Sequence, residues 1–148
     1  KHQVKLENLL NIRSFLDHNR IYHASQKKIK QKIKSSGAFC KQGERIKNNA
    51  LQQNFKDHLE KWIPYLKKYG LLIVELHTIN PKDAAQNIGK IAMTAYDASH
   101  GFSDQYILEY DLFLELASDV GLNPDPRHEY KLPSNELTIV SINRLITN

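Results

Sequence analysis

The sequence predicts an α/β fold, and three patterns support this prediction. The apolar run Leu71-Leu72-Ile73-Val74-Glu75-Leu76 is typical of a strand that is buried on both faces of a parallel sheet. Helical patterns of apolar residues precede and follow this run, over 51–66 and 112–122. Strand-like runs over 127–132 and 137–146 come last, and the alternation of helices and strands indicates the α/β class.

Three zones follow one another along the chain. Residues 1–24 contain the apolar run from Leu9 to Leu16, which is compatible with a strand and ends in a polar cluster. Residues 25–48 hold a run of lysines together with Gly37 and Gly43, so we expect a solvated, mobile insertion that can contain one basic helical turn. Residues 49–148 form the α/β core, and we treat the three zones as one partial domain.

Proline and glycine mark the element boundaries of the third zone. Apolar residues recur at helical spacing from Leu51 to Leu66, and Gly70 follows as a C-terminal cap. The string Asn80-Pro81-Lys82-Asp83 is typical of a helix start, because asparagine caps and proline fits the first turn. Pro124 and Pro126 are expected to end the region of the helix over 112–122.

The composition is that of a globular domain with 41% hydrophobic and 25% charged residues in a chain of 148. The longest aliphatic run has four residues, far fewer than the roughly 20 that a bilayer-spanning helix needs, so no membrane partner is expected. The single cysteine, Cys40, excludes an internal disulfide and a zinc-finger framework. We therefore expect a reducing, cytoplasmic setting.

Positive charge is concentrated in one segment. Eight of the basic residues lie between Lys27 and Lys47, against one acid, Glu44, so this stretch accounts for more than the net charge of +5. Clustered lysine can bind phosphate, but Lys27 to Lys34 contain no aromatic residue and no arginine for stacking or base-edge readout. Nucleic-acid binding is therefore unlikely, and a solvated loop explains the run at least as well.

Polar side chains cluster where two of the predicted strands end. Asp17-His18-Asn19-Arg20 follows the first strand, and His77-Thr78 follows the buried one. A third cluster, over 97–105, lies in a connection between helices that can fold over the same edge. Ligands of open α/β sheets bind at the carboxyl ends of the strands. Carboxylates, imidazoles and an amide form the ligand set of an iron, manganese or zinc ion.

Each of these residues also has a structural interpretation. His77 can cap backbone groups at a strand end, His100 beside Gly101 fits a turn, and Asp104 fits a helix N-cap. Glu75 inside a buried strand requires a partner or a proton, because an unpaired buried carboxylate is costly. The sequence contains no His-Glu-x-x-His or Cys-x-x-Cys pair, no glycine-rich nucleotide loop and no Gly-x-Ser-x-Gly elbow.

Three strings of residues resemble a known family: Ser14-Phe15-Leu16-Asp17-His18-Asn19-Arg20, Glu75-Leu76-His77-Thr78 and Tyr96-Asp97-Ala98-Ser99-His100-Gly101-Phe102-Ser103-Asp104-Gln105-Tyr106. With them the chain resembles the C-terminal half of a class I S-adenosylmethionine-dependent methyltransferase domain, a Rossmann-like sheet with flanking helices. More narrowly, it resembles the metal-dependent C-methyltransferases of bacterial polyketide synthase loading modules, of the apratoxin type. The resemblance spans nearly the whole chain, but the glycine-rich strand-loop-helix of the first half of such a domain is absent from this sequence.

The resemblance implies methylation, at carbon, of a malonyl-type acyl group carried by an acyl carrier protein. It implies an iron or manganese ion that would stabilise the enolate, held or surrounded by Asp17, His77, His100 and Gln105. His100 is alternatively the base that removes the α-proton. Asn19 and Arg20 would position substrate oxygens, and Tyr106 would line the catalytic pocket. The S-adenosylmethionine site would lie mostly outside this chain, in the N-terminal half of the domain, which would be a partner.

A different interpretation is a non-catalytic or split α/β interaction domain. In that case the lysine-rich segment would dock an acidic partner, and docking would weaken steeply with ionic strength.

Overall fold

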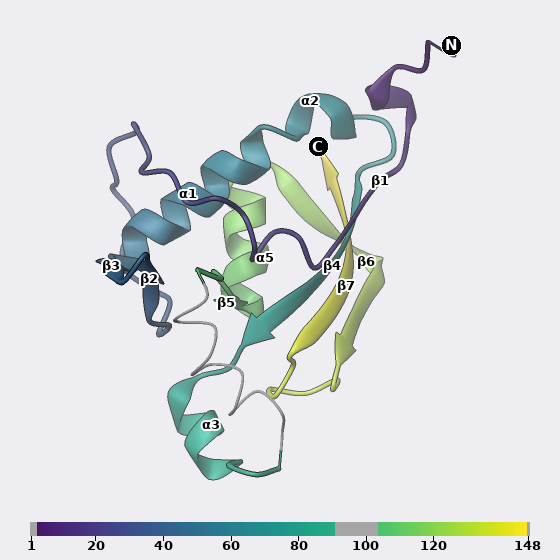
Figure 1. Ribbon diagram of the computed structural model, residues 1–148. Helices are drawn as coiled ribbons and strands as arrows, with labels where there is room; N and C mark the ends of the chain where they lie inside the picture. The colour runs from purple at the N-terminus through teal and green to yellow at the C-terminus, as the bar shows by residue number, and fades with distance from the viewer. Residues whose placement is uncertain (1–2, 91–103, 148) are drawn as a thin grey trace.

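The computed structural model describes residues 3–90 and 104–147, and it confirms the α/β prediction (Figure 1). A five-stranded sheet has the order β1-β4-β7-β6, with the short β5 paired to β4. Its strands are β1 (Asn11–Ser14), β4 (Leu71–Thr78), β5 (Leu108–Glu109), β6 (Leu122–Leu132) and β7 (Val140–Thr147). The helices are η1 (Leu6–Asn8), α1 (Asn48–Glu60), α2 (Ile63–Leu66), α3 (Pro81–Gln86) and α5 (Tyr110–Asp119). None of the helices in the described ranges combines the length and the apolarity that a membrane crossing requires.

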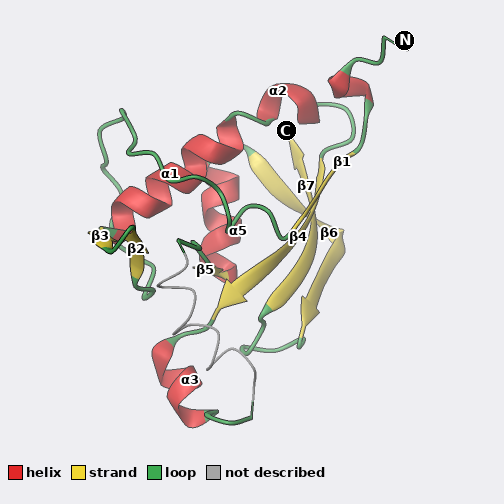
Figure 2. Ribbon diagram, in the orientation of Figure 1, coloured by secondary structure: helices red, strands yellow, loops and turns green. Residues whose placement is uncertain are grey.

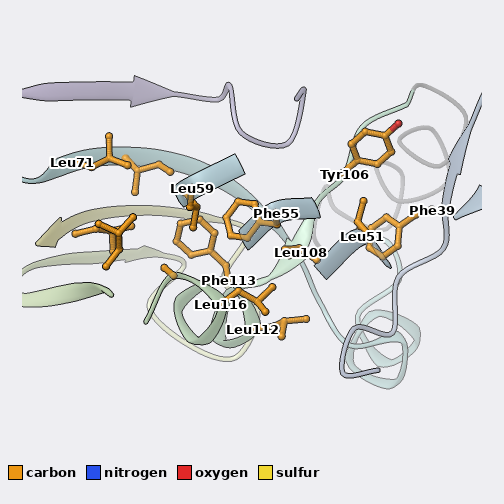
Figure 3. Packing of buried hydrophobic residues seen from close by; sticks show 14 of the residues in the cluster. Phe39, Leu51, Phe55, Leu59, Leu71, Tyr106, Leu108, Leu112, Phe113 and Leu116 are labelled. Atoms are coloured by element: carbon orange, nitrogen blue, oxygen red, sulfur yellow. The ribbon is translucent and has the colours of Figure 1, made fainter. Parts of the chain in front are cut away.

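The hydrophobic core lies between the sheet and the two longer helices, which cover the same face (Figure 2). The rings of Phe55 on α1 and Phe113 on α5 pack with their centroids 5.5 Å apart, flanked by Leu59 and Leu116 (Figure 3). Leu71 at the start of β4 is fully buried in the same cluster. The helical spacing read from the sequence therefore identified the apolar stripe of α1 correctly.

Strands β1 and β4 are parallel neighbours, and this relationship positions the candidate site. Asn11 pairs with Leu71 and Ser14 with Val74, so β1 lies beside the first half of β4 and both strands run toward the same edge of the sheet. The polar cluster that follows β1 consequently meets the last residues of β4. The prediction that these two clusters share one edge is confirmed.

The environment of β4 differs from the prediction of a strand buried on both faces of a parallel sheet. β4 runs parallel to β1 and β5 but antiparallel to β7, so the sheet is mixed. Along β4, Leu71, Ile73, Glu75 and His77 are buried, while the alternate residues Leu72, Val74 and Leu76 are only half-buried. Because these alternate positions also hold apolar residues, the sequence predicted a strand that is buried on both faces.

Two further expectations need correction. Residues 25–47 form no helical turn; they contain an extended segment and a hairpin of β2 (Phe39–Lys41) and β3 (Glu44–Ile46), anchored by the buried pair Phe39 and Ile46. Pro124 and Pro126 were expected to end the region of the preceding helix. The helix α5 already ends at Asp119, and the two prolines lie within β6, at a register shift. β6 is an edge strand, where a missing backbone N–H does not break the sheet.

Gly70 turns the chain from the end of α2 into β4. Its φ is +75°, and a Cβ at this position would lie 2.3 Å from the carbonyl oxygen of Leu145 on β7. Only glycine adopts this conformation freely and also allows so close an approach. The cap expected at Gly70 is thus also a packing requirement of the sheet.

Candidate functional site

Glu75 is the centre of a buried hydrogen-bond network at the shared edge of β1 and β4. Its Oε2 accepts the backbone N–H groups of Asp17 at 2.9 Å and of His18 at 3.1 Å. Its Oε1 accepts the N–H of Leu76 at 2.8 Å and also binds Nδ1 of His18. The Glu75 side chain is 3% exposed, so the expectation that it needs a partner is confirmed. The network satisfies the lone pairs of a carboxylate.

His18 is oriented by this carboxylate. With Nδ1–H donating to Glu75, the other ring nitrogen, Nε2, keeps its lone pair. The Nδ2 group of Asn19 donates to Nε2 at 3.1 Å from an exposed position. A histidine held by a carboxylate in this tautomer can take up a proton at Nε2 and be stabilised as an imidazolium.

Arg20 lies buried beside this pair, with one donor left over. Its Nε donates to Oδ1 of Asn54 at 2.8 Å, and Nη1 donates to the carbonyl oxygen of Asp17 at 2.8 Å. The guanidinium lies over the rings of Phe55 and Tyr106, at 4.9 and 5.5 Å from their centroids. The Arg20 residue is only 6% exposed, and a polar atom buried this far normally has a hydrogen-bond partner. Its Nη2, however, has none among the described residues. Burial lowers the pKa of Arg20 to about 10, so the group remains a cation at neutral pH.

A small hollow connects these groups. It is lined by His18, Arg20, Phe55, Glu75, Leu76, His77, Tyr106, Leu108 and Phe113. The wall combines an imidazole, a cation with a spare donor and apolar rings, and the volume of about 10 Å³ is that of about one water molecule.

Asp17 is engaged in contacts that leave it little capacity for a ligand. Both carboxylate oxygens accept from Nε of Arg13, at 3.0 and 3.1 Å, and Oδ1 also lies 2.7 Å from Nε2 of His58. Burial by itself would raise the pKa of Asp17, but the hydrogen bond with His58 and the positive charge of Arg13 outweigh it and hold that pKa below its usual range. The side chain joins β1 to α1.

His77 is buried on the helix side of β4, with both ring nitrogens engaged. Nε2 lies 2.7 Å from Oγ of Ser141, and Nδ1 lies 3.3 Å from the carbonyl oxygen of Leu108. The rings of Tyr110 and Phe113 pack edge-on against the imidazole. Burial lowers the pKa of His77 to about 3, so the ring is neutral. These contacts are typical of a satisfied core histidine.

The described part of the chain does not fit the metal site that the resemblance implies. Asp17 and His77 are engaged in other contacts, and Gln105 is half-buried. Within residues 3–90 and 104–147, no three histidine, cysteine or acidic side chains are grouped to hold an ion. His100, assigned as ligand and as base, lies outside the described residues, so both assignments stay predictions.

The substrate-positioning residues proposed from the sequence do lie together. Asn19 and Arg20 flank His18, and the backbone N–H of Tyr106 donates to the carbonyl oxygen of His18 at 2.7 Å. Tyr106 is buried, which raises the pKa of its phenol. Neither His18 nor Glu75 was assigned a role from the sequence. A carboxylate in the middle of an apolar strand was the signal that could have identified this pair.

A larger cavity of about 350 Å³ lies on the same edge, where β4 and β5 end and α5 begins. Its lining residues are Thr78, Ile79, Asn80, Asp83, Glu109, Tyr110, Asp111, Lys131, Asn135, Glu136 and Thr138. A cavity of this size can hold a small organic molecule.

One protein family matches nearly the whole chain. A family described as "AprA MT2-like domain" matches residues 1–143, which include β1, β4, the helix-covered core and the first half of β7. A search of curated proteins found no match.

Proposed function

The chain belongs to the AprA MT2-like family of methyltransferase domains, and from this premise we propose that it forms the catalytic edge of an S-adenosylmethionine-dependent C-methyltransferase. The proposed substrate is a malonyl-type acyl group on an acyl carrier protein of polyketide biosynthesis. The observation that supports the proposal most is the buried His18–Glu75 pair beside the spare donor of Arg20. Methylation at carbon needs a base and a holder for the acyl group at one place, and these residues suit both tasks.

In the proposed reaction, Nε2 of His18 removes the α-proton of the acyl group. The Glu75 carboxylate stabilises the imidazolium that results, and the electron pair of the broken C–H bond becomes the enolate of the substrate. S-adenosylmethionine, when bound, would supply the methyl group for the new carbon–carbon bond; its S–CH3 bond would break, and the electron pair would leave with the sulfur as S-adenosylhomocysteine. His18 takes the role that the sequence suggested for His100, because its Nδ1 is bound by a buried carboxylate beside Arg20. His58 and His128 also contact carboxylates, but neither lines this hollow.

Arg20 would bind the free carboxylate of the acyl group through Nη2. A guanidinium that is fixed by three acceptors and two rings loses little conformational entropy when it binds. Asn19 would contribute a donor at the exposed rim, and Tyr106 would close the pocket wall. Metal assistance would require His100 and other residues outside the described ranges, so no step is assigned to an iron or manganese ion.

The S-adenosylmethionine site is proposed to be completed by an N-terminal half that continues the sheet beyond β1. β1 is an edge strand whose Ile12 is 62% exposed and follows the exposed Leu10. The opposite edge, β6, carries Pro124, Pro126 and charged side chains over 127–131, which protect an edge from pairing. An unprotected apolar edge next to the candidate site suits a further strand that brings the methyl donor to His18.

The proposal is tested by incubating the purified protein, together with the N-terminal half that would complete the donor site, with S-adenosylmethionine and a malonyl-loaded carrier protein. Mass spectrometry of the phosphopantetheine arm is expected to show one added methyl group, and NMR of the released acyl group should place it on carbon. The non-catalytic interpretation remains the alternative, favoured by the exposed lysines over 28–32. It predicts that the carrier protein binds but that no methyl group is transferred under any donor concentration.

A further inference from the structure

The lysine-rich segment is held in place along α1. We call residues 27–34 the lysine strap. The side chain of Gln52, buried on α1, accepts the backbone N–H of Lys34 at 3.0 Å and donates to the carbonyl oxygen of Lys32 at 3.1 Å. Nδ2 of Asn48 binds the carbonyl oxygens of Ser35 and Gly37 just beyond the strap, at 2.9 and 2.8 Å. Buried amides of α1 thus hold the backbone of the strap and of the residues just beyond it.

The lysines of the strap differ in their contacts: those at its two ends form ion pairs with α1 and α5, and those between them face solvent. At its ends, Lys27 pairs with Asp57 on α1 at 3.2 Å and also with Glu60, and Lys34 pairs with Glu115 on α5. Between them, the alternate residues 29 and 31 are half-buried toward α1. Lys28, Lys30 and Lys32 are exposed, and none has an ion-pair partner among the described residues. All three lysines face solvent on a segment whose backbone bends at residue 31.

We propose that this row of three ammonium groups is the docking surface for an acidic helix of the protein that carries the acyl group. Carboxylates on an exposed helix face are the charge complement of these three ammonium groups. Arg45 and Lys47, exposed on and beside β3, extend the positive surface. The identity of the partner rests on the proposed function, whereas the docking surface rests on the geometry of the strap.

The strap is linked directly to the candidate site. Asn54 on α1 accepts Nε of Arg20 at 2.8 Å through its Oδ1 and donates to the carbonyl oxygen of His23 at 2.9 Å through its Nδ2. His23 lies four residues before the strap, so Asn54 connects the backbone that leads into the strap with the side chain of Arg20.

A nucleic acid is the less suitable partner for this surface. The strap contains neither an aromatic residue nor an arginine, so it offers no platform for base stacking and no fork for base edges. A fixed row of lysines also loses less entropy on binding than a mobile tail would.

The test measures binding of a fluorescently labelled, malonyl-loaded acyl carrier protein to the purified protein by anisotropy, at several salt concentrations. The variant Lys28→Glu/Lys30→Glu/Lys32→Glu is expected to weaken binding at least about tenfold and to flatten the salt dependence. The control Lys61→Glu/Lys67→Glu/Lys68→Glu makes the same change in net charge at exposed lysines near α2 and is expected to bind like the wild type. Thermal melting checks that both variants fold.

Equal binding by the strap variant and the wild type would overturn the proposal, as would equal weakening by the control variant. Tighter binding of a single-stranded oligonucleotide of matched charge would identify a nucleic-acid surface instead. Binding of the carrier protein does not require methyl transfer. Strap-dependent binding without methyl transfer would therefore contradict only the proposed function. Methyl transfer with strap-independent binding would contradict only the docking surface.

Discussion

His18 and Glu75 are 57 residues apart in the sequence, yet Nδ1 of the histidine binds the carboxylate where two parallel strands end. The strand register brings the residues together, and the Glu75 carboxylate also accepts two N–H groups from the chain that follows β1. The carboxylate therefore fixes both the path of this turn and the tautomer of the imidazole. Stability and the proposed chemistry depend on the same group.

The variant Glu75→Gln is expected to lower the free energy of unfolding by about 2 kcal/mol. An amide NH2 in place of one oxygen would face N–H donors that now have an acceptor. Urea denaturation measures the loss, and the exposed Glu44→Gln serves as the control that should change little. Unchanged stability of Glu75→Gln would show that the buried network contributes nothing.

The variant Arg20→Lys is expected to reduce kcat/KM for a malonyl thioester at least tenfold, a change of about 1.4 kcal/mol in transition-state binding. Lysine keeps the charge but has no planar fork to hold Asn54, the Asp17 carbonyl and a carboxylate together. The loss should be much smaller for a propionyl thioester, which has no free carboxylate. An equal loss for both substrates would mean that Arg20 is only structural; the exposed Arg127→Lys is the control.

His77 is expected to make folding pH-dependent without contributing to methyl transfer. Its pKa is lowered to about 3 in the folded protein from 6.5, so unfolding releases a ring that binds a proton below pH 6.5. Its contribution is complete above pH 6.5 and is lost as the pH falls toward 3, with a slope approaching about 1.4 kcal/mol per pH unit. Urea titrations across this range should show a shallower slope for His77→Gln than for the wild type.

The same variant separates a core histidine from a metal ligand. If His77 only packs against Tyr110 and Phe113, metal content measured by mass spectrometry should not change in folded His77→Gln. The exposed His23→Gln provides the control for both measurements. A lower metal content in His77→Gln alone would restore the ligand role that the resemblance implies.

Gly70→Ala is expected to destabilise the fold by more than about 2 kcal/mol, because the left-handed conformation and the contact with the Leu145 carbonyl act together. Gly43→Ala is the matched control: its φ is +82°, but nothing lies within 4 Å of the added Cβ. It should lose only the backbone contribution, about 1 kcal/mol. Equal losses in thermal melts of the two variants would refute the packing argument.

The sequence allowed α1, β4 and the shared edge of the site to be predicted, because apolar periodicity and glycine caps are local signals. The direction of each side chain at that edge was not predictable. Phe15 adopts a φ of 53°, which is unusual for an aromatic residue, and the turn it starts points Asp17 toward Arg13 and His18 toward Glu75. No residue type in that string signals such a turn.

The prolines of β6 were misread for a related reason. Proline ends a central strand but is compatible with an edge strand, and the position of a strand in a sheet is set by distant partners. The same holds for the alternation in β4, where the pairing with β7 determines that one face is covered by helices.

The measurement that tests the central claim most directly is deuterium exchange at the α-carbon of a malonyl-loaded carrier protein in D2O. The wild type is expected to exchange this hydrogen faster than the uncatalysed background, whereas His18→Gln should reduce exchange to that background and the exposed His128→Gln should not. Exchange that persists in His18→Gln and is lost in His100→Gln would contradict the account and assign the proton transfer to the residue named from the resemblance.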